Sequence, residues 1–163
     1  MIITYITNLA RASNAPEAST PSNHMNPSTI PGIVKIQFIY AEYLRPHLMY
    51  SSMAGAIPAL AAPASNIPFF GTPTLKWESV MENGVAREKA TLEFTSKGYV
   101  NTVARGGFVV TLASGKQYLI GTREPKYPQI TFSETTGTPG GEAAVRTYKI
   151  THVAQKSVLP CVL

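Results

Sequence analysis

The most constraining feature of this sequence is a series of alternating apolar and polar residues that begins at Leu75 and is divided by short turns. Residues 75–81 and 86–94 alternate with a period of two, as strands with one buried face do. Between them lies Asn83-Gly84, whose two residues both tolerate the positive φ of a type I′ turn. This pattern predicts a β-hairpin and, with it, an antiparallel sheet.

Five further segments are rich in β-branched and aromatic residues, which favours strands. These segments are 33–44, 108–112, 117–121, 129–133 and 144–154. Ser114-Gly115 predicts the turn of a second hairpin, residues 100–105 are ambiguous between strand and loop, and 157–160 form a short tail. Six or seven strands with almost no helix predict an all-β domain, either an antiparallel sandwich or a small barrel.

The chain divides into an N-terminal arm, residues 1–32, and a β-domain, residues 33–163. Residues 12–31 are rich in Ser, Asn, Thr and Pro and are longer than an ordinary connection. We expect this stretch to be disordered or to wrap over a neighbour. In the first strand, alternation places Ile36 and Phe38 on one side and Gln37 and Ile39 on the other.

Residues 46–74 form a long apolar loop without Lys, Arg, Asp or Glu. An exposed loop of this composition typically marks an interface, and the alternative is a lid folded over the domain's own core. One short helix is possible over 54–62, broken at Pro58. The interface interpretation assigns four apolar anchors: Met49, Met53, Phe69 and Phe70.

Residues 121–128 are predicted to form a rigid polar corner, because Pro125 and Pro128 cannot donate to a strand ladder. Such a corner either connects two sheets or contacts another subunit. In the second case Arg123, Glu124 and Tyr127 are the interface residues.

The residues that carry chemistry argue against an enzyme. All nine acidic residues are Glu, which excludes aspartate dyads, Asp-containing triads and EF-hand loops. His24, His47 and His152 are scattered without ligand spacing, and the single Cys161 excludes a disulfide framework. We therefore expect no catalytic residue, no metal, no cofactor and no small-molecule ligand.

One carboxylate pair needs a separate explanation. Glu78 and Glu93 are expected to face each other across the first hairpin, as a glycosidase pair would. Ion pairs with Lys76, Arg87 and Lys89 on a solvated face explain them without catalysis.

The net charge of +5 leaves nucleic acid as a possible partner. The basic residues available for a patch, and the tyrosines available for stacking beside them, are Lys97, Arg105, Lys116, Arg123, Lys126, Tyr99, Tyr118 and Tyr127. The modest excess of charge favours a mildly basic surface instead. No membrane span is expected, because prolines interrupt the longest uncharged stretch.

The region 72–163 resembles a known group of proteins in the order of its motifs. The motifs are LKWESVMENGVAREKATLEF, GFVVTLASGKQYLIG, TREPKYP, a Gly-Pro loop and a terminal strand that ends in LPC, with residues 119–124 as the most specific stretch. They resemble small β-rich virion proteins in the structural modules of tailed phages and prophages of Bacteroidetes-type bacteria. The resemblance implies an assembly role in the tail or the head–tail connection.

These observations lead to one main hypothesis. The chain is expected to be a non-enzymatic virion protein that forms a homo-oligomeric ring or tube in the tail or neck. Its partners would be copies of itself and neighbouring virion proteins, with nucleic acid present only as the passing genome. The alternatives are a capsid decoration protein and a nucleic-acid-binding β-barrel.

Overall fold

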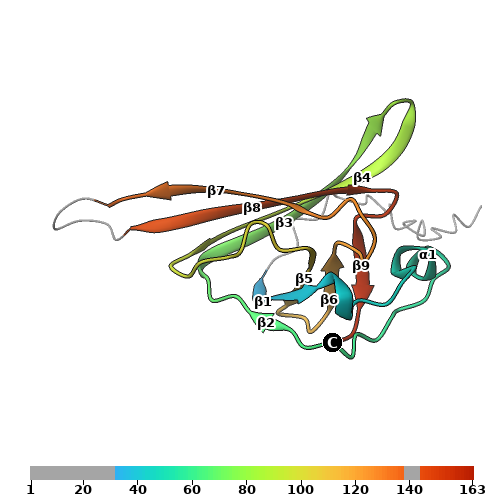
Figure 1. Cartoon of the computed structure of the whole chain (residues 1–163), viewed down its shortest axis with the longest axis horizontal. Helices are drawn as coiled ribbons and strands as arrows, with labels where there is room; N and C mark the ends of the chain where they lie inside the picture. Colours follow the sequence, from blue (N-terminus) through green and yellow to red (C-terminus); the bar gives the residue numbers. More distant parts are fainter. Residues whose placement is uncertain (1–31, 138–143) are drawn as a thin grey trace, which may run out of the picture.

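The alternating segments form two antiparallel sheets in the computed structural model, which describes residues 32–137 and 144–163 (Figure 1). The five-stranded sheet has the order β2-β1-β5-β6-β9, made of Ser65–Asn66, Ile33–Tyr40, Gly106–Leu112, Gln117–Ile120 and Val158–Cys161. The four-stranded sheet has the order β3-β4-β8-β7, made of Phe70–Glu82, Val85–Ser96, Val145–Ala154 and Gln129–Thr135. The predicted all-β fold is confirmed, and of the two predicted architectures it is the antiparallel sandwich and not the small barrel.

The main core lies between the two sheets. The four-stranded sheet contributes inward-facing residues such as Leu92 and Ile150, and the five-stranded sheet contributes Ile36 and Phe108. Their burial follows from the alternation of each strand, since every second side chain points to the same face. The predicted division of β1 holds, because Ile36 and Phe38 join this core while Ile39 points away from it.

A second core covers the opposite face of the five-stranded sheet. Ile39, Val109 and Leu119 pack there against side chains of the chain that follows β1, among them Leu48 and Leu60. This sheet is therefore buried on both faces. The two cores explain why its strands contain unbroken apolar runs such as Phe108-Val109-Val110, whereas β4 alternates.

The apolar segment 46–74 is more structured than a loop. It contains α1 (Leu48–Met53), which follows the 3-10 turn η1 (Ala41–Tyr43), then β2 and the first residues of β3. The helix predicted over 54–62 is wrong. Gly55 has a φ of 88°, and Pro58 disfavours helical backbone at the residue before it, so the helix ends at Met53.

The predicted hairpin turns are confirmed, and the short strands were missed. Asn83 and Gly84 have φ values of 51° and 76°, as a type I′ turn requires. Residues 100–105 form no strand. The described residues form nine strands, against the six or seven predicted. The strands β2 and β9 were missed because they are too short to show alternation in the sequence. The predicted arm up to residue 31, and 138–142 of the predicted loop 135–142, lie outside the described residues.

Candidate assembly surfaces

The four-stranded sheet has an outer face made of polar side chains. Register places Thr91, Glu93 and Thr95 of β4 beside Lys149 and Thr147 of β8 on this face. Lys149 Nζ lies 2.8 Å from a carboxylate oxygen of Glu93. A face of threonines and paired charges is stable in water, so the fold requires no partner to cover it.

The two edges of this sheet are β3 and β7. Within residues 32–137 and 144–163, β3 pairs along its length with β4 alone, and β7 pairs with β8 alone. Nearly every residue of β7 is exposed. An edge strand presents unpaired backbone N–H and C=O groups, which makes it a template for pairing with another chain.

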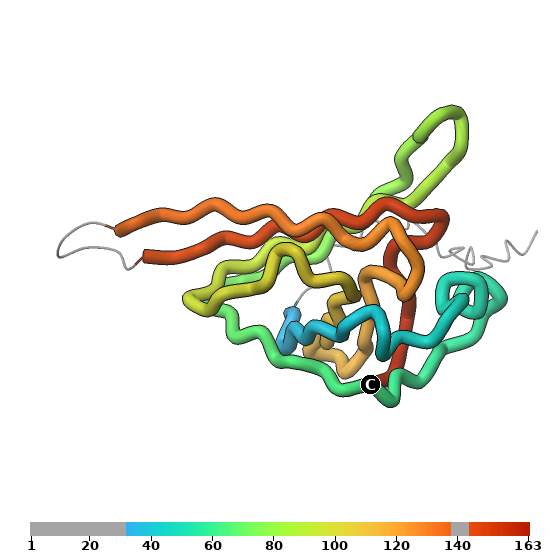
Figure 2. The backbone as a smooth tube through the Cα atoms, viewed as in Figure 1, coloured from blue at the N-terminus to red at the C-terminus, as the bar shows by residue number. Residues whose placement is uncertain are grey.

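Two hairpins extend beyond the five-stranded sheet in different directions, as the trace in Figure 2 shows. One is the end of β7–β8, and the other is the turn between β3 and β4. The β3–β4 turn carries exposed Met81 and Val85, 71% and 50% accessible. These two apolar side chains are separated from both cores, so they contribute little to the fold of the chain.

The part of β7–β8 that extends beyond the sandwich carries an aromatic and charged cluster. Arg146 lies with its guanidinium carbon 5.8 Å from the ring centroids of both Phe132 and Tyr99, and its Nε lies 3.2 Å from Glu134. Phe132 and Tyr99 remain 50% and 71% exposed. Exposed aromatic side chains of this kind are common at protein interfaces.

The predicted interface residues of the 121–128 corner have partners within the chain. Arg123 Nη1 donates to the carbonyl oxygen of Leu44 at 3.3 Å, and Glu124 Oε1 accepts from the backbone N–H of His47 at 2.9 Å. Tyr127 donates to the Arg123 carbonyl at 3.1 Å. These bonds hold the corner against the turn before α1, where His47 has a φ of 60°. The structural role is thus accounted for, and the interface role stays a prediction.

The four apolar anchors lie in two separate places. Met49 is half-buried against the second core, beside Glu124 in a cleft of about 310 Å³, and Met53 is 53% exposed at the end of α1. Phe69 packs against the main core, and Phe70 is 39% exposed beneath Lys97. Met53 and Phe70 therefore keep the exposure that an interface requires, whereas Met49 and Phe69 serve the fold.

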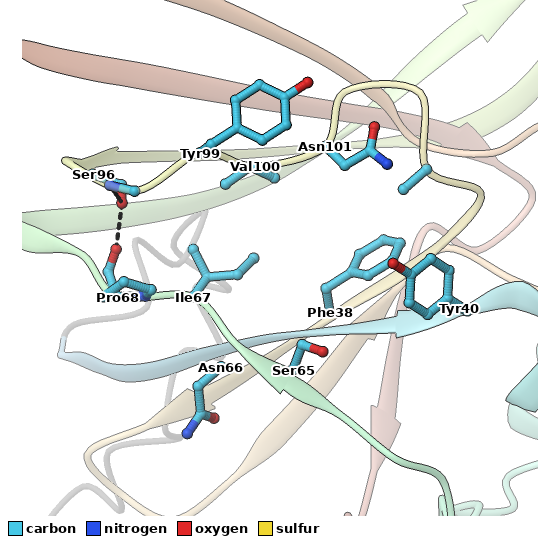
Figure 3. Close-up of a pocket in the computed structure, with 12 residues that line it drawn as sticks. Phe38, Tyr40, Ser65, Asn66, Ile67, Pro68, Ser96, Tyr99, Val100 and Asn101 are labelled. Atoms are coloured by element: carbon cyan, nitrogen blue, oxygen red, sulfur yellow. Dashed lines mark hydrogen bonds between the residues drawn. The ribbon is translucent and has the colours of Figure 1, made fainter.

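A cleft of about 220 Å³ lies between β1–β2 and the connection 96–104 (Figure 3). Its aromatic residues are Phe38, Tyr40 and Tyr99, and its polar groups come from Ser65, Asn66 and Asn101. None of its lining residues is Lys, Arg, His, Asp or Glu. The sequence could not reveal this cleft, because its walls come from three segments that are far apart in the chain.

Hydrogen bonds hold the wall of the cleft formed by 96–104. The Ser96 hydroxyl donates to the Pro68 carbonyl at 2.5 Å and accepts from the Gly98 N–H at 3.0 Å (Figure 3 draws the first bond). The Tyr148 hydroxyl donates to the Gly98 carbonyl and accepts from the Val100 N–H, both at 3.1 Å. These four bonds hold the first part of the connection, residues 96–100, against Pro68 and β8.

Removing one oxygen atom should test this arrangement. We expect Tyr148→Phe to lower the free energy of unfolding by about 1–3 kcal/mol, because the buried Val100 N–H loses its partner. The measurement is urea unfolding followed by tryptophan fluorescence. Tyr118→Phe is the control, since among the described residues no hydrogen bond involves the Tyr118 hydroxyl. An equal stability of Tyr148→Phe and wild type would show that the two bonds do not hold the connection.

The groups considered for catalysis are not brought together. Register places Glu78 opposite Lys89 and Glu93 opposite Thr74, so the expectation that the two carboxylates face each other is wrong. Each has a lysine partner instead, Lys76 for Glu78 and Lys149 for Glu93. Burial raises the pKa of the Cys161 thiol to about 12, which leaves it protonated near neutral pH.

Two wider searches of the described residues were negative. No group of three His, Cys or Glu side chains lies close enough to hold a metal ion there. In the same residues, no helix has the length and apolar character needed to cross a membrane.

Comparisons with protein-family models, with characterised proteins and with solved structures found no match.

Proposed function

We propose that this chain is a non-enzymatic structural subunit of a tailed-phage virion, which assembles with copies of itself into a ring or tube of the tail or neck. The observation that carries the proposal is the four-stranded sheet, whose two edge strands have no second partner strand among the described residues. The phage context comes from the resemblance of residues 72–163 to small β-rich virion proteins.

Pairing between edge strands of two copies would extend the sheet and keep neighbouring strands antiparallel. Each strand in the order β3-β4-β8-β7 is antiparallel to the next, so β7 runs opposite to β3. If all copies have the same orientation, β7 of one copy is antiparallel to β3 of the next. Such pairing is β-augmentation between copies. It is a head-to-tail contact, which closes into a ring when the rotation per copy divides a full turn.

The polar outer face supports pairing through the edges over stacking through the faces. The inner face is already covered by the five-stranded sheet, and the outer face of threonines and ion pairs would lose hydration if another protein covered it. A ring built by edge pairing leaves this face in water. The low charge content of the chain, 14%, is consistent with a subunit that buries much of its surface against neighbours.

The proposal predicts that a single lysine on β7 prevents assembly. Ser133→Lys adds a charge to the exposed edge, which natural proteins use to block edge pairing. We expect the assembly constant to fall at least about tenfold, with monomers replacing rings. The measurement is the mass of the purified protein over a concentration series, with electron micrographs of the same samples.

Thr147→Lys is the matched control, because Thr147 lies directly opposite Ser133 on the same face but on an inner strand. It should assemble as the wild type does. Rings formed equally well by Ser133→Lys would contradict pairing through β7. A wild-type protein that stays monomeric at the highest concentration would contradict self-assembly, and stable trimers would favour a decoration protein.

A further inference from the structure

We propose that the aromatic cleft between β1–β2 and the connection 96–104 binds the proline-containing arm segment, residues 12–31, of a neighbouring copy. This inference rests on the proposed function in one respect, since it requires that two copies meet. It adds what the sheet edges do not provide, namely a receptor for the arm.

The lining of the cleft has the chemistry that recognises an extended, proline-containing peptide. Polyproline II segments have no internal hydrogen bonds and dock in grooves lined by aromatic rings, which contact the prolines while polar side chains bind the free carbonyls. The rings of Phe38 and Tyr40 lie 5.1 Å apart at one end of the cleft (Figure 3). Ser65 supplies a hydroxyl group and Asn101 an amide group to the cleft (Figure 3).

The cleft is also held in shape before any ligand binds. Ser96 fixes one wall to Pro68, and Tyr148 fixes Gly98 and Val100. Phe38 packs edge-on against Phe108 of the main core, with ring centroids 5.2 Å apart. A preformed site loses little conformational entropy on binding, which favours a weakly structured partner such as a short peptide.

The arm fits this site by composition. Residues 12–31 contain four prolines, Pro16, Pro21, Pro27 and Pro31, together with Ser, Thr and Asn, and one acidic residue, Glu17. An almost uncharged peptide matches a cleft without charged side chains, since neither partner has to bury an unpaired charge. The 20 residues of the segment could span about 60 Å in the polyproline II conformation, more than enough to cross the cleft.

The position where the arm joins the domain favours binding between copies. The chain enters β1 at Gly32, whose carbonyl accepts a hydrogen bond from the Ala113 N–H beside the β5–β6 turn. The cleft lies toward the other end of β1, at Phe38 and Tyr40, about 20 Å away at about 3.3 Å per residue. An arm that binds its own cleft has to reverse its direction along β1, and the arm of a neighbouring copy does not have to make that reversal.

Disulfide trapping between two differently substituted full-length chains tests the proposal. Ser22→Cys places a thiol in the arm next to Pro21, and Ser65→Cys places one in the cleft, where the Ser65 side chain points inward (Figure 3). The native Cys161 is 4% exposed, so it does not compete in the folded protein. The two chains, one labelled with ¹⁵N, are mixed and oxidised gently, and the disulfide-linked peptides are identified by mass spectrometry.

The matched control replaces Ser65→Cys with Ser51→Cys, a serine of equal chemistry exposed on α1 outside the cleft. Both thiols are first compared for their reactivity with glutathione. We expect the link between positions 22 and 65 to form at least about tenfold faster than the link between positions 22 and 51. Adding Tyr40→Ala, which removes the ring beside Phe38 in the cleft, should slow the first link about tenfold, as loss of an aromatic contact does, whereas Tyr50→Ala, another exposed tyrosine, should not.

Two results would overturn the inference. One is equal linking at positions 65 and 51. The other is a link that forms within a single chain carrying both Ser22→Cys and Ser65→Cys but never between mixed chains, which would mean that the arm binds its own cleft.

Electron micrographs of the same samples separate this inference from the proposed function. Uniform rings without the link between positions 22 and 65 would support ring formation and contradict arm binding in the cleft. A fast link between these positions in chains that form no ring would support arm binding and contradict the ring.

Discussion

Replacing Gly106 with alanine is expected to destabilise the five-stranded sheet strongly, because the added Cβ would overlap backbone atoms. Gly106 lies opposite Tyr40, where the end of β1 crosses β5 at close range. A Cβ atom at this position would overlap the Ile39 carbonyl oxygen and would lie 2.8 Å from the Phe38 ring. The Ile39 carbonyl cannot move without opening the β1–β5 ladder, because it belongs to the backbone of a buried strand residue.

We expect Gly106→Ala to lower the free energy of unfolding by at least about 3 kcal/mol, or to leave the protein insoluble. Urea unfolding measures the loss. The control is Gly115→Ala in the β5–β6 turn, where a Cβ meets nothing within 4 Å and the cost is the positive φ of 81°. That substitution should cost about 1 kcal/mol. Similar losses for the two variants would mean that β1 and β5 do not approach each other closely at Gly106.

The second large effect concerns pH. His152 is 4% exposed on the inner face of β8, opposite Ala90, and its Nε2 has no hydrogen-bond partner in the described residues. Burial lowers the pKa of this imidazole from 6.5 to about 4, because the charged form loses its hydration. Between these two values the unfolded chain binds a proton that the folded chain excludes.

The free energy of unfolding should therefore have its full value above pH 6.5 and fall as the pH decreases from 6.5 toward 4. A shift of this size removes about 3 kcal/mol from the free energy of unfolding at pH 4. The measurement is a series of urea unfolding curves between about pH 7 and pH 4. The decrease in the free energy of unfolding with falling pH should become much smaller in His152→Gln. It should remain in His47→Asn, since His47 is exposed and asparagine tolerates its positive φ.

A wild-type protein whose stability does not change over this pH range would contradict the effect assigned to His152. If the free energy of unfolding falls equally with pH in wild type and in His152→Gln, the pH dependence belongs to the carboxylates instead.

The candidate surfaces were only partly predictable. The corner residues Arg123 and Glu124 were recognised by the prolines around them, and their partners, the Leu44 carbonyl and the His47 N–H, are 79 and 77 residues away. No local pattern identifies such partners, so a structural corner and a contact with another subunit both stayed open in the sequence. Tyr148 is a similar case. The alternation of residues 144–154 predicted a strand, but it did not predict that the Tyr148 hydroxyl bonds to Gly98 and Val100 in the connection 96–104.

The apolar segment 46–74 was also only partly predictable. Its composition correctly indicated that it must cover or contact an apolar surface. Leu48 and Leu60 cover the chain's own five-stranded sheet, while Met53 and Phe70 stay exposed. Composition reports how much apolar surface a segment has, but it does not report which surface the segment meets.

The sequence by itself determined the fold class, the turn at Asn83-Gly84 and the inward side of β1, because alternation and turn conformation depend on neighbouring residues alone. The tertiary structure alone decided four other features. It made β3 and β7 the edges of their sheet, covered the five-stranded sheet on both faces, formed the aromatic cleft, and buried His152 with no hydrogen-bond partner for its Nε2 in the part of the chain that the structure describes. Each of these depends on pairing between residues far apart in the chain, and the order and register of such pairs follow from the packing of the whole domain.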